Sequence, residues 1–376
     1  MFPRVNFLLI FGIIITVLAL IYFLLSSLTS DEAPRPKISY SHLKHSIETD
    51  RLVDLISSAA SSYRLSPSGN PCEDESLDIL GVILVSSYVT HDDLRSAHRR
   101  ALPESKLKSL GFVRLFLLAE IPLSERSITQ TLLEGEQKRF QDILQGSFTD
   151  AYRNLTYKHV MGLKWATLNC SRASFIVKMD DDTVFDVHRL RKILQEFRMS
   201  HNEGEHLLSG YVQSNQKPIR LKPSKWFVSH REFRDAIYPT YLSGWLYMTN
   251  QRTAQDLVIA SQKTPFFWID DIFVTGILSK KLNIPLDRRN ALYSANKDFI
   301  DCCIRDAEKH HYKCPYMAGP NGGEAELIGK FTTIVAECPD CHERTASDPR
   351  ITDTCVGVVK YHPGKPGEPM VKELHL

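Results

Sequence analysis

Residues 175–185 read FIVKMDDDTVF, an apolar run that leads into three adjacent aspartates. Neighbouring carboxylates repel one another unless a cation joins them. Side chains alternate between the two faces of a strand, so we expect Asp180 and Asp182 on one side and Asp181 on the other. A solvated turn is the alternative, but apolar residues resume at once after the triplet. Carboxylate oxygens suit Mn²⁺ or Mg²⁺ shared with substrate phosphates, so the stretch predicts a divalent-metal site.

From Leu77 onward, on both sides of this stretch, short apolar runs alternate with amphipathic segments. Such alternation is typical of βαβ units and predicts an α/β fold with a central, mostly parallel sheet. Ligands of such sheets bind beyond the carboxyl ends of the strands, where the aspartates fall. We expect strands over Ile79–Ser86, Val113–Ala119, Phe175–Met179, Leu207–Val212 and Leu242–Met248, and helices over Leu94–Leu102, Ile128–Phe140, Leu155–Leu168, Leu190–Phe197 and Thr253–Ser261.

The N-terminus carries a candidate membrane anchor. Phe7 to Leu25 contains no charged residue and no proline. Nineteen residues at helical rise extend about 28 Å, close to the hydrocarbon thickness of a bilayer. Arg4 precedes the run and acidic residues follow it, which indicates a cytoplasmic N-terminus and a lumenal remainder. A cleavable signal peptide is the alternative, but the apolar run is longer than a typical one and lacks a clear cleavage site.

This topology divides the chain into four parts. We predict a cytoplasmic tail over 1–6, a signal-anchor transmembrane helix over 7–28, a stem over 29–75 and a lumenal catalytic domain over 76–376. The serine-rich composition of residues 57–68 supports the stem.

Composition and cysteine content agree with this compartment. The chain has 376 residues, 43% of them hydrophobic, and a formal net charge of +2, which argues against a nucleic-acid partner. Its eight cysteines indicate disulfides in an oxidising lumen. A zinc cluster of Cys314, Cys338, Cys341 and Cys355 is the alternative. Sequons begin at Asn154 and Asn169 and predict N-glycosylation, although Asn154 could instead cap a helix.

Two further segments contain candidate site residues. Residues 265–276, PFFWIDDIFVTG, place Asp270 and Asp271 in an apolar setting just before a helical pattern. One aspartate is explained as a helix cap, and a second suggests a semi-buried carboxylate with a raised pKa, suitable as a general base. In residues 238–247, YPTYLSGWLY, Gly244 within a strand often marks a close approach of a ligand or another backbone. Aromatic core packing is the alternative there.

Taken in order, these segments resemble the β1,3-glycosyltransferases of the galactosyltransferase and Fringe type, glycosyltransferase family 31, from about Leu77 to Ile284. The matching motifs are DAYRNLT at 150–156 followed by Lys164-Trp165 and Cys170, KMDDDTVF at 178–185, YPTYLSG at 238–244 and DDIFVT at 270–275. There are departures. The family's arginine-rich box is degenerate at 95–102, Thr275 replaces a glycine, and the region after Cys302 matches little.

The resemblance implies a GT-A-like nucleotide-sugar-binding fold and an inverting enzyme of the Golgi membrane, a single-pass type II protein with a lumenal catalytic domain. Such an enzyme moves galactose or an N-acetylhexosamine from a UDP-sugar to a glycan acceptor on a glycoprotein or glycolipid. Asp271 would be the catalytic base, and Asp180, Asp182 and His311 would hold Mn²⁺ or Mg²⁺, with His362 as a second choice for the histidine. The residues expected to contact the nucleotide sugar are Asp180 again, together with Arg99, Trp165, Lys178, Asp181 and Gly244.

Two other functions fit parts of the pattern. Asp180-x-Asp182-x-Val184 also matches phosphatases of the haloacid dehalogenase type, which form an aspartyl phosphate, whereas an inverting transferase forms no covalent intermediate. That motif lies about a hundred residues into the domain rather than at its start. A lumenal lectin or partner chaperone with the same fold and no catalysis is the non-enzyme alternative.

Overall fold

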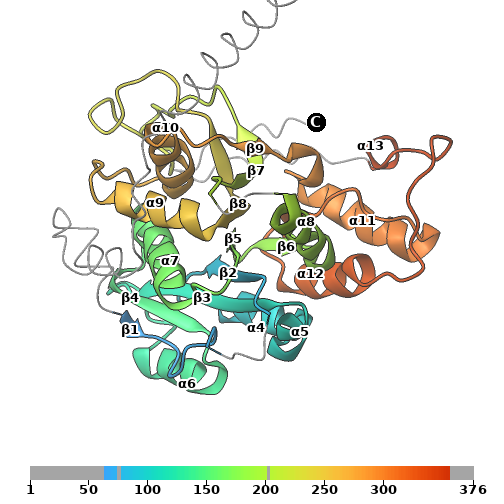
Figure 1. The fold of residues 1–376 in the computed structure, drawn as a ribbon, viewed down its shortest axis with the longest axis horizontal. Helices are drawn as coiled ribbons and strands as arrows, with labels where there is room; N and C mark the ends of the chain where they lie inside the picture. Colours follow the sequence, from blue (N-terminus) through green and yellow to red (C-terminus); the bar gives the residue numbers. More distant parts are fainter. Residues whose placement is uncertain (1–62, 74–77, 201–203, 356–376) are drawn as a thin grey trace, which may run out of the picture. The chain divides into compact units, whose positions relative to one another are not determined.

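The central sheet carries helices on both faces in the computed structural model, which describes residues 63–73, 78–200 and 204–355 (Figure 1). Its strand order is β1-β4-β3-β2-β5-β8-β7-β9, and a second, two-stranded sheet pairs β10 with β6. The strands are β1 (Tyr63–Leu65), β2 (Gly81–Ser86), β3 (Phe112–Glu120), β4 (Ile143–Thr149), β5 (Phe175–Asp180), β6 (Thr183–Phe185), β7 (Leu208–Gln213), β8 (Tyr241–Asn250), β9 (Asp287–Arg288) and β10 (Ala318–Pro320).

Helices connect most of these strands. The α-helices are α4 (Asp92–Ala101), α5 (Glu104–Ser109), α6 (Gln130–Phe140), α7 (Leu155–Asn169), α8 (Val187–Ser200), α9 (Gln251–Ser261), α10 (Ser279–Lys281), α11 (Lys297–His310), α12 (Ala325–Lys330) and α13 (Ile351–Thr354). Short helical turns of other types span Tyr152–Asn154, Ile272–Leu278, Asn290–Leu292 and Phe331–Ala336.

Strand β5 lies where the direction of the sheet changes. It pairs in parallel with β2, with Ser86 opposite Asp180, and antiparallel with β8. Strands β4, β3, β2 and β5 therefore form a parallel half, and β8 and β7 begin a mixed half. The first residues of β8 and the last residues of β7 consequently lie at the same edge as the carboxyl end of β5.

Two apolar cores fix the sheet between its helices. Every residue of β2 is buried, as expected of a parallel strand covered on both faces. One core joins alternate residues of β2 and β3 to α7 and α9, and the other joins the intervening residues to α5 and α8. The alternation sends neighbouring side chains to opposite cores, as a strand requires.

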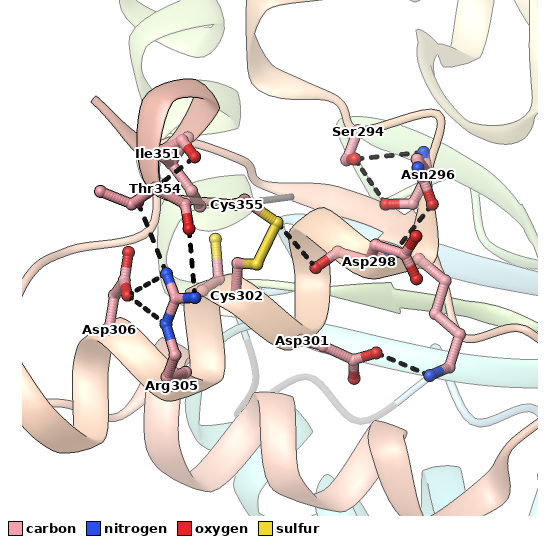
Figure 2. Close-up of a disulfide and its surroundings, with 12 residues drawn as sticks. Ser294, Asn296, Asp298, Asp301, Cys302, Arg305, Asp306, Ile351, Thr354 and Cys355 are labelled. Carbon is pink, nitrogen blue, oxygen red and sulfur yellow. Dashed lines mark hydrogen bonds and ion pairs between the residues drawn. A yellow bond between two sulfur atoms is a disulfide. The ribbon is translucent and has the colours of Figure 1, made fainter. Parts of the chain in front are cut away.

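The C-terminal part of the described chain forms a third core beside α4, built from α11, α12 and the buried Val184 of β6. The disulfide Cys302–Cys355 joins α11 to the residue that follows α13 (Figure 2). Arg305, one turn away on α11, donates to the carbonyl oxygen of Thr354 at 3.4 Å. A covalent link and side-chain bonds thus hold this region together where regular structure is short.

All eight cysteines are paired, which confirms disulfides and overturns the zinc alternative. The pairs are Cys72–Cys170, Cys302–Cys355, Cys303–Cys314 and Cys338–Cys341. The four cysteines of the supposed zinc cluster belong to three different disulfides, so none is a free thiolate.

The α/β class, the mostly parallel sheet, and all five strands and five helices expected from the sequence are confirmed, with ends shifted by a few residues. Asn154 does occupy the N-cap position of α7, but its side chain makes no capping bond. Strand β1 pairs with β4 although it lies in the segment assigned to the stem, so the sheet includes residues before 76.

The expected transmembrane helix over 7–28 lies outside the described residues. Among the residues that the structure does describe, no helix has the length and apolar character needed to cross a bilayer.

Candidate active site

The acidic triplet lies at the end of the central strand. Asp180 is the last residue of β5, and the next two aspartates form the turn into β6. The Lys178 ammonium donates to Asp180 Oδ1 at 2.7 Å and to the carbonyl oxygen of Gly244 at 3.0 Å, and it lies 3.5 Å from Asp270 Oδ2. A lysine that is 1% exposed therefore links the two acidic motifs. Burial alone would lower its pKa, but the two carboxylates raise it, so it stays protonated.

The Asp180 and Asp182 carboxylates need more positive charge than this lysine supplies. Burial and the carboxylates of Asp182 and Asp270 raise the pKa of Asp180 to about 8, although Lys178 opposes the rise. Burial and the neighbouring Asp181 also raise the pKa of Asp182. Hard oxygen donors in need of a countercharge fit a divalent cation such as Mn²⁺ or Mg²⁺.

Asp271 begins a helical turn beside these residues. Its Oδ1 accepts a hydrogen bond from the backbone of Ile272 at 2.8 Å, and its Oδ2 accepts one from the backbone of Gly244 at 3.3 Å. Burial is the larger cause that raises the pKa of Asp271 well above its usual range, and repulsion from the Asp270 carboxylate is the second. A carboxylate whose pKa is raised toward neutral pH suits general-base chemistry, and the role of Asp271 as the base stays a prediction.

Asp270 has a different environment from its neighbour. Its Oδ2 lies 2.9 Å from His159 Nδ1, and His159 Nε2 lies 2.6 Å from the hydroxyl of Tyr247. Burial lowers the pKa of His159, so the imidazole is neutral. Lys178 and His159 hold the pKa of Asp270 low against the effect of burial. An ionised Asp270 accepts from Nδ1–H, which leaves Nε2 to accept from Tyr247. Asp270 is thus an ionised carboxylate that holds the Lys178 and His159 side chains in place.

Gly244 separates the two motifs. A Cβ at this position would lie 3.2 Å from Lys178 Nζ, 3.5 Å from Asp271 Cβ and 3.7 Å from Asp180 Oδ2. The absent side chain lets β8 approach the acidic residues closely, as the sequence predicted for a glycine in this strand.

Asp181 turns away toward α4. Its Oδ2 lies 2.9 Å from His91 Nδ1, and its carbonyl oxygen lies 2.9 Å from His98 Nε2. Burial would raise the pKa of Asp181, but bonds from His91 and Ser87 lower it below its ordinary value. Asp181 therefore ties the triplet to the loop after β2 rather than adding an open ligand.

The second sheet adds a residue that sequence analysis did not identify. The backbone N–H of Asn321, just after β10, donates to the carbonyl oxygen of Asp182 at 2.7 Å. The Asn321 side chain is fully buried, and its Nδ2 has no partner among the described residues. Such a donor can give a hydrogen bond to an acceptor atom of a bound molecule.

The structure does not bring Arg99 to the acidic residues. Its guanidinium is held by Asp142 at 2.7 and 2.9 Å and by Glu136 at 2.7 Å. Arg95, one turn earlier on α4, is fully buried and donates to the carbonyl oxygens of Tyr88 and Val89, which follow β2. Helix α4 follows β2, so it begins at the edge of the sheet where ligands bind. Arg95 in its first turn therefore lies nearer that edge than Arg99, which lies one turn further along the helix.

Trp165 and His311 also lie apart from the site. Trp165 is buried in the core between the sheet and α7. His311 is an exposed residue that ends α11 in the left-handed conformation. Within the described ranges, no group of three or more His, Cys, Asp or Glu side chains is arranged to hold a metal, and His311 as a ligand stays a prediction. His362 lies outside the described residues.

The sequence around these acidic residues matches a known protein family. The family described as Galactosyltransferase matches residues 94–290, and the chain belongs to that family. Beta-1,3-galactosyltransferase 5 of Mus musculus is 32% identical over 62% of this chain and 75% of its own length. Beta-1,3-galactosyltransferase brn of Drosophila melanogaster is 33% identical over 54% and 61% of the two chains. The predicted family and the β1,3-galactosyltransferase-like enzyme class are confirmed, and the phosphatase alternative is overturned.

Likeness to solved structures is weak. A glycosyltransferase involved in the glycosylation of the major capsid of PBCV-1 aligns over 68% of this chain and 99% of its own. The identity is 8% and the TM-score is 0.33, too low to carry an argument.

Proposed function

We propose that the protein is an inverting β1,3-galactosyltransferase that moves galactose, or an N-acetylhexosamine, from a UDP-sugar to a hydroxyl of a glycan on a glycoprotein or glycolipid. The observation that carries this proposal is the half-buried Asp271 carboxylate, whose raised pKa suits it to take a proton and which lies beside Asp180 across Gly244.

In the proposed reaction, Asp271 accepts the proton of the acceptor hydroxyl while that oxygen attacks C1 of the sugar. The bond from C1 to the UDP oxygen breaks as the new bond forms, so the configuration inverts without a covalent intermediate. Asp270, held by Lys178 and His159, stays ionised and keeps the pKa of Asp271 high. Both carboxylates serve one reaction because their surroundings separate their pKa values.

Asp180 and Asp182 are the residues that would hold Mn²⁺ or Mg²⁺, which when bound neutralises negative charge on the departing UDP. Lys178 keeps Asp180 in place through its 2.7 Å bond. The disulfides support a lumenal location, and together with the apolar segment 7–28 they are consistent with the proposed Golgi-membrane anchor.

Release of UDP tests this function. The full-length chain would be supplied with UDP-galactose, UDP-N-acetylglucosamine and UDP-N-acetylgalactosamine, with Mn²⁺ and with a chelator, alongside Asp182→Ala. We expect chelator-sensitive UDP release from one donor and its loss in the variant. A folded chain that binds UDP but releases none with any donor across a broad acceptor set would instead support the non-catalytic lectin or chaperone.

A further inference from the structure

A cavity lies beside the candidate active site, at the β7, β8 and β9 side of the sheet. Its volume is about 690 Å³, within the range of ligand pockets. Residues from the end of β7, from the segment before β8, from α10 and from β9 line it, among them Ser214, Tyr238, Thr240, Lys280 and Arg288. The lining contains two cations and no carboxylate.

Tyr238 offers this cavity a hydrogen-bond donor. The side chain is 7% exposed, and its hydroxyl has no hydrogen-bond partner among the described residues. A buried hydroxyl without a partner is unfavourable unless a bound molecule satisfies it. Burial raises the pKa of Tyr238 to about 12, so the hydroxyl keeps its proton and can donate it to an acceptor atom.

The segment that supplies Ser214 and residues 238–240 to the cavity lining is positively charged as well. Residues 214–240, which connect β7 to β8, contain six Lys or Arg and two acidic residues, whereas the whole chain has a net charge of only +2. Lys280 and Arg288 themselves are exposed. Positive charge gathered around a concave site attracts anions and raises their local concentration.

The cavity also adjoins the candidate base. Asp271 begins the helical turn Ile272–Leu278, and a Cβ on Gly276 of that turn would lie 3.3 Å from Pro239 Cγ, in the cavity wall. The Asp271 carboxylate also contributes to the raised pKa of Tyr238. A molecule that reaches Asp271 with one hydroxyl can therefore extend into the cavity.

We propose that this cavity binds an anionic group, a carboxylate, sulfate or phosphate, carried by the acceptor glycan. Arg288 and Lys280 supply charge, and the Tyr238 hydroxyl donates a hydrogen bond to the same group. The inference rests on the proposed function and adds the class of acceptor. The UDP donor is the rival anion, but Asp180 and the loop after β2 lie on the other half of the sheet.

The test uses matched neutral and anionic glycosides. Binding of p-nitrophenyl β-galactoside and its 6-sulfate, and of the corresponding β-glucoside and β-glucuronide, would be measured by calorimetry on the full-length chain with UDP present. We expect the anionic member of at least one pair to bind tenfold or more tightly. In the variant Lys280→Gln/Arg288→Gln the preference should fall to within twofold.

Two controls complete the design. Tyr238→Phe should weaken binding of the preferred anionic glycoside about threefold or more, while Lys309→Gln, an exposed position on α11 outside the cavity lining, should change nothing. Absence of any anionic preference, or its survival in the double variant, would overturn the inference. So would a loss of UDP affinity in the double variant, because the cavity would then belong to the donor.

Failure of the inference and failure of the proposed function are distinguishable. UDP release from the donor sugar would be followed in the same preparation. Release without an anionic preference removes only the acceptor inference, whereas a folded chain that releases no UDP from any donor removes the proposed function.

Discussion

At the residue scale, Lys178 and Gly244 decide how the two acidic motifs meet. Lys178 lies between Asp180 and Asp270, and the missing side chain of Gly244 leaves room for that ammonium. An unpaired buried charge is strongly unfavourable, so each member of this group depends on the others.

Replacement of Gly244 by alanine tests this close approach. The new Cβ would lie 3.2 Å from Lys178 Nζ, so the ammonium must shift and the carboxylates with it. We expect a loss of at least about tenfold in kcat, since small displacements of catalytic groups are costly. The measurement is donor turnover together with the melting temperature.

Gly135→Ala is the matched control for that variant. Gly135 lies within α6, and a Cβ added there would point into open space, with no neighbouring residue of the described chain within 4 Å. Alanine should therefore stabilise the helix by up to about 1 kcal/mol and leave kcat unchanged. Equal activity of the two alanine variants would refute the role given to Gly244.

At the element scale, α4 supports the turn that follows β5. His98 on this helix lies 2.9 Å from the carbonyl oxygen of Asp181. Burial lowers the pKa of His98 from 6.5 to about 4, so the folded protein holds the neutral imidazole.

This shift predicts a loss of stability in acid. The unfolded chain takes up a proton at His98 below about pH 6.5, while the folded chain does so only near pH 4, so stability falls as pH decreases through that window. Linkage gives about 2 kcal/mol at pH 5 from this residue. His98→Gln should flatten the change in unfolding free energy between pH 7 and pH 5 by roughly that amount. An unchanged slope would show that His98 is not a source of the acid sensitivity.

Elements with clear periodicity could be predicted from the sequence, and the others could not. Strand β2 is an unbroken apolar run, whereas β4 reads ILQGSFT and includes the buried Gln145, which bonds Gln130 and the carbonyl oxygen of Ala119. Strand β10 is three residues long and is defined by its pairing with β6. Its position depends on long-range packing that local pattern does not encode.

The same limit applies to the site. The acidic pairs are adjacent in sequence, so Asp180 to Asp182 and Asp270 to Asp271 could be identified directly. His159 is separated from Asp270 by 111 residues, and Asn321 meets Asp182 only through the second sheet. Arg99 was assigned from a family pattern that is degenerate here, while the fold turns it toward Asp142.

At the scale of the whole molecule, the disulfides close loops of very different length. Cys72–Cys170 spans 98 residues and joins the segment after β1 to the end of α7, whereas Cys338–Cys341 spans three. A longer closed loop removes more entropy from the unfolded chain.

Removal of Cys72–Cys170 by serine substitution at both positions should therefore destabilise the fold by about 4 to 5 kcal/mol, and the corresponding change at Cys338 and Cys341 by about 2 kcal/mol or less. Urea unfolding of the two variants provides the comparison. A larger loss from the short loop would contradict this order.

The most direct test of the whole account is the transfer rate of Asp271→Asn, measured with the donor identified by UDP release and compared with Asp340→Asn at an exposed position. We predict a decrease in kcat of about 10² to 10⁴, typical of a lost general base, with UDP affinity within twofold of the wild type and a β-linked product from the active chains. A variant that retains kcat within a few-fold, or a product with retained configuration, would contradict the assignment of Asp271 as the base of an inverting transfer.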